Sequence, residues 1–385
     1  MDFDFDDDQR MLAESVRLQL SKEYGLAQRR AQQSSDAYLD HDLWREWGAL
    51  GWLGVMIPEA HGGIGQDLVS AMLLVEAFGE HLVIAPLVES LIDSGRVLER
   101  LGSADQRGQW LPRLADGAAI MTLAHGEAGA GYDRMAVACS VRTAADGYIL
   151  CGTKSSIPFA ASADRWIVTA RLCGDGGEEA GISALLVDPS AAGIAIESYH
   201  GIDGTPMADL RFDDVRLPRS ALLGEAGGAW RAIDDTLVES LAATCIEAVG
   251  VMSTLLRLTL DYVKMRNQFG APIGSFQAIQ HRLADMYMKL ELARPLAWLA
   301  VHSAGRPAEE RHCLLAAAKA QISESCRFIG EQAVQLHGGI GMTDEAEPSH
   351  AFRRLVALEK KLGDRHHHVG TIAHALAEGK PTIYA

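Results

Sequence analysis

The chain has 385 residues, of which 48% are hydrophobic and 22% are charged, a balance that is typical of globular proteins and too apolar for intrinsic disorder. Its 35 Lys and Arg residues against 51 Asp and Glu residues give a formal net charge of −16, which repels phosphate backbones and anionic membranes and argues against nucleic acid or membrane as a partner. The six cysteines show neither zinc-site spacing nor a disulfide framework, so we expect no metal site and a reducing, cytoplasmic location. Because no signal peptide and no run of about 18 apolar residues is visible, we expect a soluble, intracellular protein.

In the first two thirds of the chain, the residue pattern changes near residue 118 from one typical of helices to one typical of β-strands. Over residues 7–115, apolar positions recur mostly every three or four residues, which predicts amphipathic helices interrupted by a Pro and Gly turn at Ile57–Gly63. From about residue 118 to 224, short β-rich runs such as Ile182–Val187 alternate with turn signals, one of them at 174–177. This middle third is predicted to form an antiparallel β domain.

The last third is predicted to be helical. Ala229–Met265 has no turn signals and predicts one helix of about ten turns. A second helix is expected from Phe276 and a third over Glu309–Leu336. The predicted fold class is therefore mostly helical α+β in three domains: an N-terminal helical domain (1–117), a middle β domain (118–225) and a C-terminal helical domain (226–385).

The junction between the first two C-terminal helices gathers polar side chains. Arg266 and Gln268 follow the long helix, Phe269 opens a tight Gly and Pro turn, and Gln277 lies in the first turn of the next helix. Arg forks match phosphate oxygens, and helix N-termini offer free N–H groups. The junction could bind an anion, although a capped, solvated helix turn explains the same residues.

A glycine-rich stretch ends the third helix. Gln335 is followed by Leu-His, by Gly338 and Gly339, and by Ile-Gly. Glycines let a backbone approach a ligand closely or adopt a positive φ after a helix. Taken alone, this stretch is equally compatible with an ordinary helix cap, and no dinucleotide-binding or Walker A motif occurs elsewhere.

Together and in this order, the two stretches resemble the C-terminal motif of the acyl-CoA dehydrogenase family of flavoproteins. The resemblance extends over essentially the whole chain, including the turn at Pro58-Glu59-x-x-Gly62-Gly63. It implies that the C-terminal bundle mediates oligomerisation and that FAD is bound across a subunit interface. The residues implied for the pyrophosphate and adenosine end of FAD are Arg266, Gln268, Phe269, Gln277, Gln335 and the backbone of Gly338 and Gly339.

The reaction that the resemblance implies is the α,β-dehydrogenation of an acyl-CoA thioester to the trans-2-enoyl-CoA. A carboxylate removes the α-proton, a hydride passes to the flavin, and an electron-transfer flavoprotein accepts the electrons. The chain looks most similar to the small subunits of pimeloyl-CoA dehydrogenases, through His125, Glu127, Tyr132-Asp133 and the Leu362-Gly363-Asp364 ending. That similarity implies a dicarboxylyl-CoA substrate such as pimeloyl-CoA.

The catalytic base departs from the family pattern. The usual Glu position falls at Leu362-Gly363-Asp364 without an aligned carboxylate, and the alternative family position falls on Ser240. We expect Glu247, two turns after Ser240 on the same helix face, to be the base, in a partly desolvated environment that raises a carboxyl pKa. An ion pair with an Arg is the structural alternative for Glu247, and Glu239 is the second candidate. The neighbours expected to leave room for a ligand are Ala243, Thr244, Gly250 and Val251.

The segments that contact the flavin ring in the family also differ. Gly126–Asp133 reads Gly-Glu-Ala-Gly-Ala-Gly-Tyr-Asp, and Ser156–Ala160 lacks the ring Trp and the hydroxyl that faces the flavin N5. Backbone groups around Ile157 could still contact the ring. Because the adenosine-end motif is complete and the ring end is not, the chain is expected to complete a site on a differently built partner, although a homo-oligomer (dimer or tetramer) stays open.

Two other functions remain open at this point. The chain could be a catalytically silent structural subunit of a heteromeric dehydrogenase, or a flavin oxidase or monooxygenase on the same fold. The run His366-His367-His368 predicts a solvated helix start, with a contact to a substrate carboxylate or a CoA phosphate as the alternative. No second cluster at ligand spacing supports a metal there.

Overall fold

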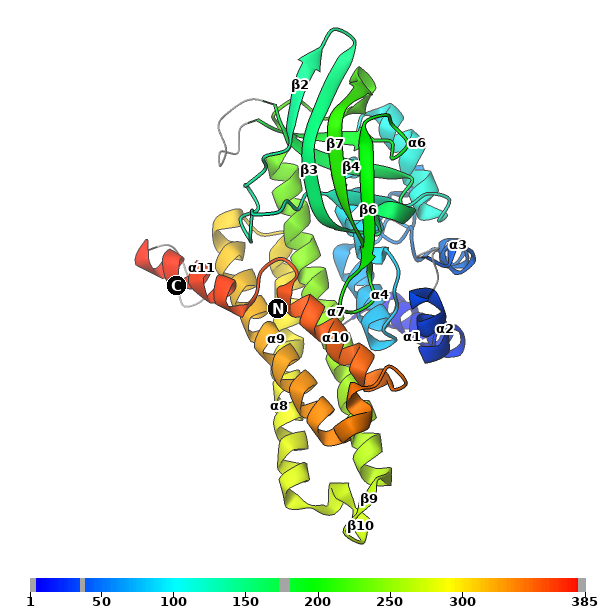
Figure 1. The fold of residues 1–385 in the computed structure, drawn as a ribbon, viewed down its shortest axis with the longest axis vertical. Helices are drawn as coiled ribbons and strands as arrows, with labels where there is room; N and C mark the ends of the chain where they lie inside the picture. The colour runs from blue at the N-terminus through cyan, green and yellow to red at the C-terminus, as the bar shows by residue number, and fades with distance from the viewer. Residues whose placement is uncertain (1–4, 35–38, 173–180, 380–385) are drawn as a thin grey trace. The chain divides into compact units, whose positions relative to one another are not determined.

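The computed structural model describes residues 5–34, 39–172 and 181–379 (Figure 1). Their contacts divide the chain into two compact units. The first contains Met1–Arg30, Leu68–Val83 and Leu241–Ala385, and the second contains Ala31–Asp67 and Ile84–Ser240. The turn expected at 174–177 and Cys173 lie outside the described residues.

The first unit is helical. α1 (Asp7–Glu23) begins at a capping box in which the Asp6 side chain and Gln9 satisfy each other's backbone N–H groups. The other helices of this unit are α4 (Leu68–Glu80), most of α7 (Trp230–Met265), α8 (Gln277–Ala304), α9 (Ala308–His337), α10 (Glu347–Lys360) and α11 (Arg365–Ala377). The starts of α7, α8 and α9 and the end of α9 each differ by one residue from the prediction, and α7 ends at Met265 as predicted.

Helix α7 is the long apolar element of the bundle. An 18-residue window in it has a mean hydropathy of 1.5, but 83% of that window is buried within the protein, as in the core helix of a globular protein. Two glycines allow α4 and α7 to approach closely. A Cβ on Gly250 would lie 2.3 Å from the backbone oxygen of Glu76, and a Cβ on Gly79 would lie 2.5 Å from that of Glu247, so neither position has space for a side chain.

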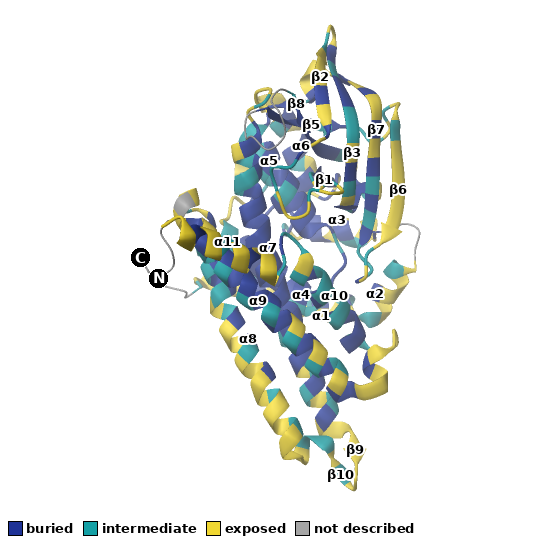
Figure 2. Cartoon of the chain, turned by 60° about the vertical axis from the view of Figure 1, so that its left-hand side comes forward, coloured by how far each residue is buried: buried dark blue, intermediate teal, exposed yellow. Residues whose placement is uncertain are grey.

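The second unit is built on a β-sheet in the strand order β6-β7-β3-β2-β4-β5-β8, with β1 paired to β4. The long strands β3 and β7 pair antiparallel at the centre of this part of the sheet, and β6 is an edge strand whose side chains are mostly exposed (Figure 2). The strands are β1 (Met121–Ala124), β2 (Ser140–Ala144), β3 (Gly147–Pro158), β4 (Arg165–Arg171), β5 (Ile182–Val187), β6 (Ile194–His200), β7 (Pro206–Pro218) and β8 (Leu222–Leu223). Most pairs are antiparallel as predicted, whereas β4 runs parallel to β1 and to β2.

Helices complete the second unit. α3 (His41–Ala49), the π-helical turn η2 (Val88–Ser94), α5 (Gly95–Leu101) and α6 (Ala104–Ala115) belong to it, and α2 (Leu26–Gln33) begins in the first unit and ends in this one. The predicted Pro and Gly turn is the short 3-10 helix η1 (Glu59–His61), which ends at Gly62 with a φ of 80°. The order of helices, β domain and helices that the sequence predicts is confirmed.

Candidate functional site

The polar junction after α7 folds into a small hairpin. β9 (Asn267–Gln268) pairs with β10 (Ala271–Pro272) around a turn in which Phe269 and Gly270 both adopt positive φ angles. The Ile273 N–H donates to the Arg266 backbone oxygen at 2.8 Å, which closes the base of the hairpin. After the 3-10 turn η5 (Ile273–Ser275), α8 begins at Gln277. Arg266 and Gln277 therefore lie at the two ends of one short connection.

The glycine-rich stretch lies at the end of α9. Gly338 has a φ of 64° and begins the 3-10 turn η6 (Gly338–Met342). No described atom lies within 4 Å of the position that a Cβ would take on Gly338 or Gly339, so this backbone is open to a ligand.

Two contacts bring the junction and the glycine stretch together. The ring of Tyr262 on α7 stacks on that of His337 at the end of α9, with centroids 4.5 Å apart. The Arg282 guanidinium on α8 donates to the Gln332 side-chain oxygen on α9 at 2.7 Å. The structure thus assembles the two sequence motifs from three helices at one end of the helical unit.

The assembled residues fit the pyrophosphate of FAD. The side chains of Arg266, Gln277 and Gln335 are exposed, and within the described ranges none of them has a hydrogen-bonding or ionic partner. A guanidinium and two amides without partners beside open glycine backbone are donors of the kind that bind phosphate oxygens. Gln268 is committed instead to a hydrogen bond with the Asn267 backbone oxygen at 2.8 Å, and the Phe269 ring, 93% exposed, meets Phe276 edge-to-face.

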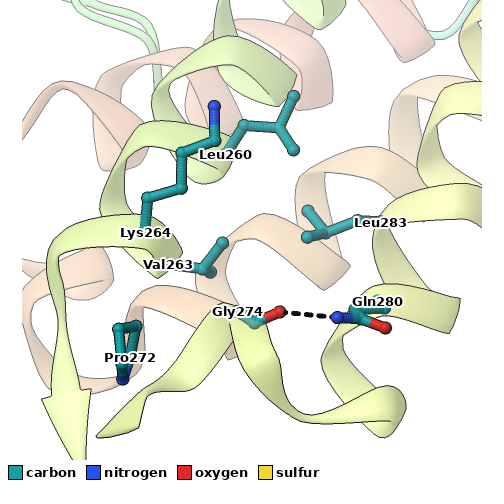
Figure 3. Close-up of a pocket in the computed structure, with 7 residues that line it drawn as sticks. All are labelled: Leu260, Val263, Lys264, Pro272, Gly274, Gln280 and Leu283. Atoms are coloured by element: carbon teal, nitrogen blue, oxygen red, sulfur yellow. Dashed lines mark hydrogen bonds between the residues drawn. The ribbon is translucent and has the colours of Figure 1, made fainter.

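A pocket of about 510 Å³ lies between the last turn of α7 and the first turns of α8 (Figure 3). The Gln280 amide donates to the Gly274 backbone oxygen at 3.0 Å and borders this pocket. Its lining is Leu260, Val263, Lys264, Pro272, Gly274, Gln280 and Leu283. The site therefore combines anion-binding donors with neighbouring apolar space.

Glu247, the base expected from the sequence, is buried in an ion pair. Its carboxylate accepts from the guanidinium of Arg354 on α10 at 2.6 Å, and the Glu247 side chain is 9% exposed. The room for a ligand expected beside Gly250 is taken by α4, whose backbone leaves no space for a Cβ there. The structure thus shows Glu247 in an ion pair with an arginine, which was the alternative prediction for this residue.

Glu239, the second candidate, is also paired with arginine. Its carboxylate accepts from Arg100 at 2.6 Å and from Arg96 at 3.1 Å, both on α5. Arg100 additionally donates to the Thr236 hydroxyl at 2.6 Å. Ser240, at the alternative family position, is 1% exposed.

The turn at Leu362-Gly363-Asp364 is held by groups that sequence reasoning missed. The ammonium of Lys319 on α9 is almost fully buried and donates to the backbone oxygens of Leu358, Glu359 and Gly363 at 2.9 to 3.0 Å. Leu362 adopts a φ of 57°, and its carbonyl accepts from the His368 ring at 3.1 Å.

The ends of this turn correct one expectation. His368 is 5% exposed, so the prediction of a solvated histidine run is wrong at that residue, while His366 and His367 are exposed. The Asp364 carboxylate accepts the His367 N–H at 3.0 Å and caps α11. This hydrogen bond lowers the pKa of Asp364, which suits a helix cap and not a base.

The β domain contains a buried polar cluster under the Gly126–Asp133 loop. The fully buried Lys154 ammonium donates to Glu127 at 2.7 Å and to the Thr169 hydroxyl at 3.0 Å. The Glu127 carboxylate also accepts the N–H groups of Ala138 and Cys139. His125 bridges Thr169 and the Arg134 backbone oxygen, and burial together with the nearby Lys154 lowers its pKa to about 3.

The strand expected to face the flavin ring has a polar cluster where the family has Trp. Ser156 adopts a φ of 57°, and its hydroxyl lies 3.0 Å from the Tyr199 hydroxyl. The Ser156 N–H donates to the Asp209 carboxylate at 2.8 Å, and Tyr199 donates to the same carboxylate. The Ile157 side chain is 2% exposed, so only its backbone is available to a ring. This segment offers no flat aromatic surface and does not match the usual ring platform.

Family models match the chain over most of its length. The model for the acyl-CoA dehydrogenase N-terminal domain matches residues 6–118, that for the middle domain residues 122–215, and that for the C-terminal domain residues 227–377. Among curated proteins, the probable acyl-CoA dehydrogenase YngJ of Bacillus subtilis is 32% identical over 90% of this chain and 91% of its own length. The human mitochondrial short-chain specific acyl-CoA dehydrogenase is 32% identical over 80% of this chain and 76% of its own length.

Solved structures of similar fold cover almost the whole chain. A Tcur3481-Tcur3483 steroid ACAD variant matches with a TM-score of 0.86 and 31% identity over 97% of this chain and 98% of that one. The ChsE4-ChsE5 complex from Mycobacterium tuberculosis matches with a TM-score of 0.87 and 25% identity, over 99% of this chain and 100% of that one. A glutaryl-coenzyme A dehydrogenase with glutaryl-CoA matches with a TM-score of 0.88 and 25% identity, over 98% of this chain and 97% of that one.

Proposed function

Because the chain belongs to the acyl-CoA dehydrogenase family, we propose that it is one subunit of a two-component enzyme and supplies the adenosine-diphosphate end of the FAD site to a differently built partner. The chain is an FAD-dependent oxidoreductase that acts on acyl-CoA. When bound, the flavin supplies the hydride acceptor, and the protein supplies binding, orientation and proton transfer.

One asymmetry carries the proposal. Arg266, Gln277 and Gln335 are exposed donors with no partner in the described ranges, beside the open backbone of Gly338. The β strand that should face the ring instead uses Ser156 in a hydrogen-bonded cluster with Tyr199 and Asp209. A chain that keeps one end of a cofactor site and lacks the usual residues of the other is expected to share the site with a second chain.

The two candidate base carboxylates also support an active site that is shared between two chains. Glu247 and Glu239 are both held by arginines, and removing one partner of such a buried pair leaves an uncompensated charge. We propose that both are structural ion pairs and that the α-proton is removed by a carboxylate of the partner chain. Glu247 as the base of this chain is the competing proposal.

The substrate and the electron acceptor are also proposals. We propose a dicarboxylyl-CoA such as pimeloyl-CoA, on the resemblance of His125, Glu127 and Tyr132-Asp133 to the small subunits of pimeloyl-CoA dehydrogenases. One similar structure is a glutaryl-coenzyme A dehydrogenase with glutaryl-CoA, another belongs to work on an electron-transferring flavoprotein of Acidaminococcus fermentans, and two are named as pairs, Tcur3481-Tcur3483 and ChsE4-ChsE5. These similar structures favour an electron-transfer flavoprotein as acceptor and a heteromer as the assembly.

The proposal is tested by isolating the complex through a tag on this chain, expressed in its native host, and weighing it by native mass spectrometry. We expect a heteromer with a second acyl-CoA dehydrogenase-like chain and one FAD for each pair of chains. A homo-oligomer with one FAD for each copy would contradict the proposal.

A further inference from the structure

We infer that Tyr262 and His337 form a positioning pair that sets the spacing between the two halves of the pyrophosphate site. The inference rests on the proposed function, because it concerns the same FAD site. It assigns a role to two residues outside the set of seven that the sequence motifs imply for FAD.

The pair connects the ends of two helices. Tyr262 lies in the last turn of α7, four residues before Arg266, and His337 directly precedes Gly338 at the end of α9. Their rings are stacked with centroids 4.5 Å apart and an interplanar angle of 27°. Stacked rings prefer a defined separation and orientation, so the pair fixes how far the Arg266 end lies from the glycine backbone.

The His337 ring is itself fixed. Its Nδ1 lies 2.9 Å from the Ala333 backbone oxygen, so the Nδ1–H donates to that carbonyl, and the side chain is buried. Burial lowers the pKa of His337, which disfavours protonation of the ring in this position. The ring position is therefore determined from both helices.

The position of the residues after His337 depends on the stacking of His337 on Tyr262. Gly338 and Gly339 have no side chains, and no atom of the described residues lies within 4 Å of a Cβ built on either. Arg266 and Gln277 are likewise exposed. Since no hydrogen bond or ion pair among the described residues joins the donors of the two halves, their relative placement is set by the helices that carry them, which Tyr262 and His337 join directly.

The test compares three variants of the full chain by titration with FAD and with ADP. We expect Tyr262→Leu and His337→Leu to raise the Kd for both ligands at least 10-fold, and Tyr262→Phe, which keeps the ring, to stay within 2-fold of wild type. Rescue by Phe separates positioning from general packing, because Leu is also apolar. Wild-type affinity in Tyr262→Leu would overturn the inference, and so would an equal loss in Tyr262→Phe.

A second measurement decides the inference if the wild-type chain alone binds both ligands too weakly to titrate, a result that is compatible with a site shared with a partner chain. Amide hydrogen exchange is compared between wild type and Tyr262→Leu. We expect the amides of residues 339–342 to exchange at least 10-fold faster in the variant, with α10 unchanged. Equal exchange at residues 339–342 would show that the stack does not hold this segment.

Discussion

The carboxylate of Glu247 on α7 and the guanidinium of Arg354 on α10 meet at 2.6 Å inside the helical unit. The two residues are separated by 107 positions in the sequence, and both side chains are largely buried. A carboxylate held in this way is well placed to join two helices and poorly placed to approach a substrate, because the arginine occupies one of its oxygens.

Replacing Glu247 by Gln should lower stability and leave catalysis of the assembled enzyme intact. The uncompensated Arg354 charge is expected to cost about 3–5 kcal/mol in the free energy of unfolding. Urea unfolding measures the loss, and steady-state turnover with the partner chain present measures catalysis. A drop in turnover of 100-fold or more at an unchanged unfolding midpoint would make Glu247 the base and refute the structural assignment.

Replacing Arg266 by Ala should weaken FAD binding without affecting the fold. The loss of a hydrogen-bonding charge is expected to cost about 1.5–3 kcal/mol, which corresponds to a rise in Kd of roughly 10-fold to 100-fold at 1.4 kcal/mol per decade. Arg327→Ala is the matched control, since Arg327 is an exposed helix residue that forms an ion pair with Glu331 on the same helix. Equal FAD affinity in the two variants would remove Arg266 from the site.

Replacing Lys319 by Met should destabilise the helical unit strongly. The ammonium satisfies three backbone oxygens at the end of α10 and in the Leu362 turn, and each buried acceptor left without a donor costs about 1–3 kcal/mol. We expect a loss of about 3–5 kcal/mol in urea unfolding. A loss below about 1 kcal/mol would mean that water replaces the ammonium and that the turn does not depend on it.

His125 should make the folded state sensitive to acid. Its pKa is about 3 in the fold against 6.5 in the unfolded chain, so between these values the unfolded state binds a proton that the folded state does not. Stability is therefore lost as the pH falls below about 6.5, while at pH 7 the residue is neutral in both states. Between pH 7 and 4.5, His125→Gln should lose about 2–3 kcal/mol less than wild type. Parallel pH profiles would contradict the shifted pKa.

The sequence predicted the helices well because they are local patterns, and the residues proposed to bind FAD also lie in local motifs. The apolar run with few turn signals placed α7 over Ala229–Met265, and the structure has Trp230–Met265. Arg266, Gln277, Gly338 and Gly339 lie within short motifs whose residue types already indicate phosphate chemistry. Such features need no knowledge of the tertiary fold.

The contacts that could not be predicted from the sequence join segments that lie far apart along the chain. No local pattern pairs Glu247 with Arg354, stacks Tyr262 on His337 or aims Lys319 at the Leu362 turn. The small residues beside Glu247 were also misinterpreted, because they suggested space for a ligand where Gly250 in fact admits the backbone of α4. His368 was misjudged for the same reason, since its burial depends on the turn at Leu362.

The central claim is that this chain carries only one end of a functional FAD site. It is tested most directly by the visible spectrum of the chain purified alone, before and after anaerobic addition of pimeloyl-CoA and a panel of other acyl-CoAs. We predict much less than one flavin per chain and no bleaching by any thioester. About one FAD per chain that bleaches with an acyl-CoA would contradict the claim and establish a self-sufficient dehydrogenase.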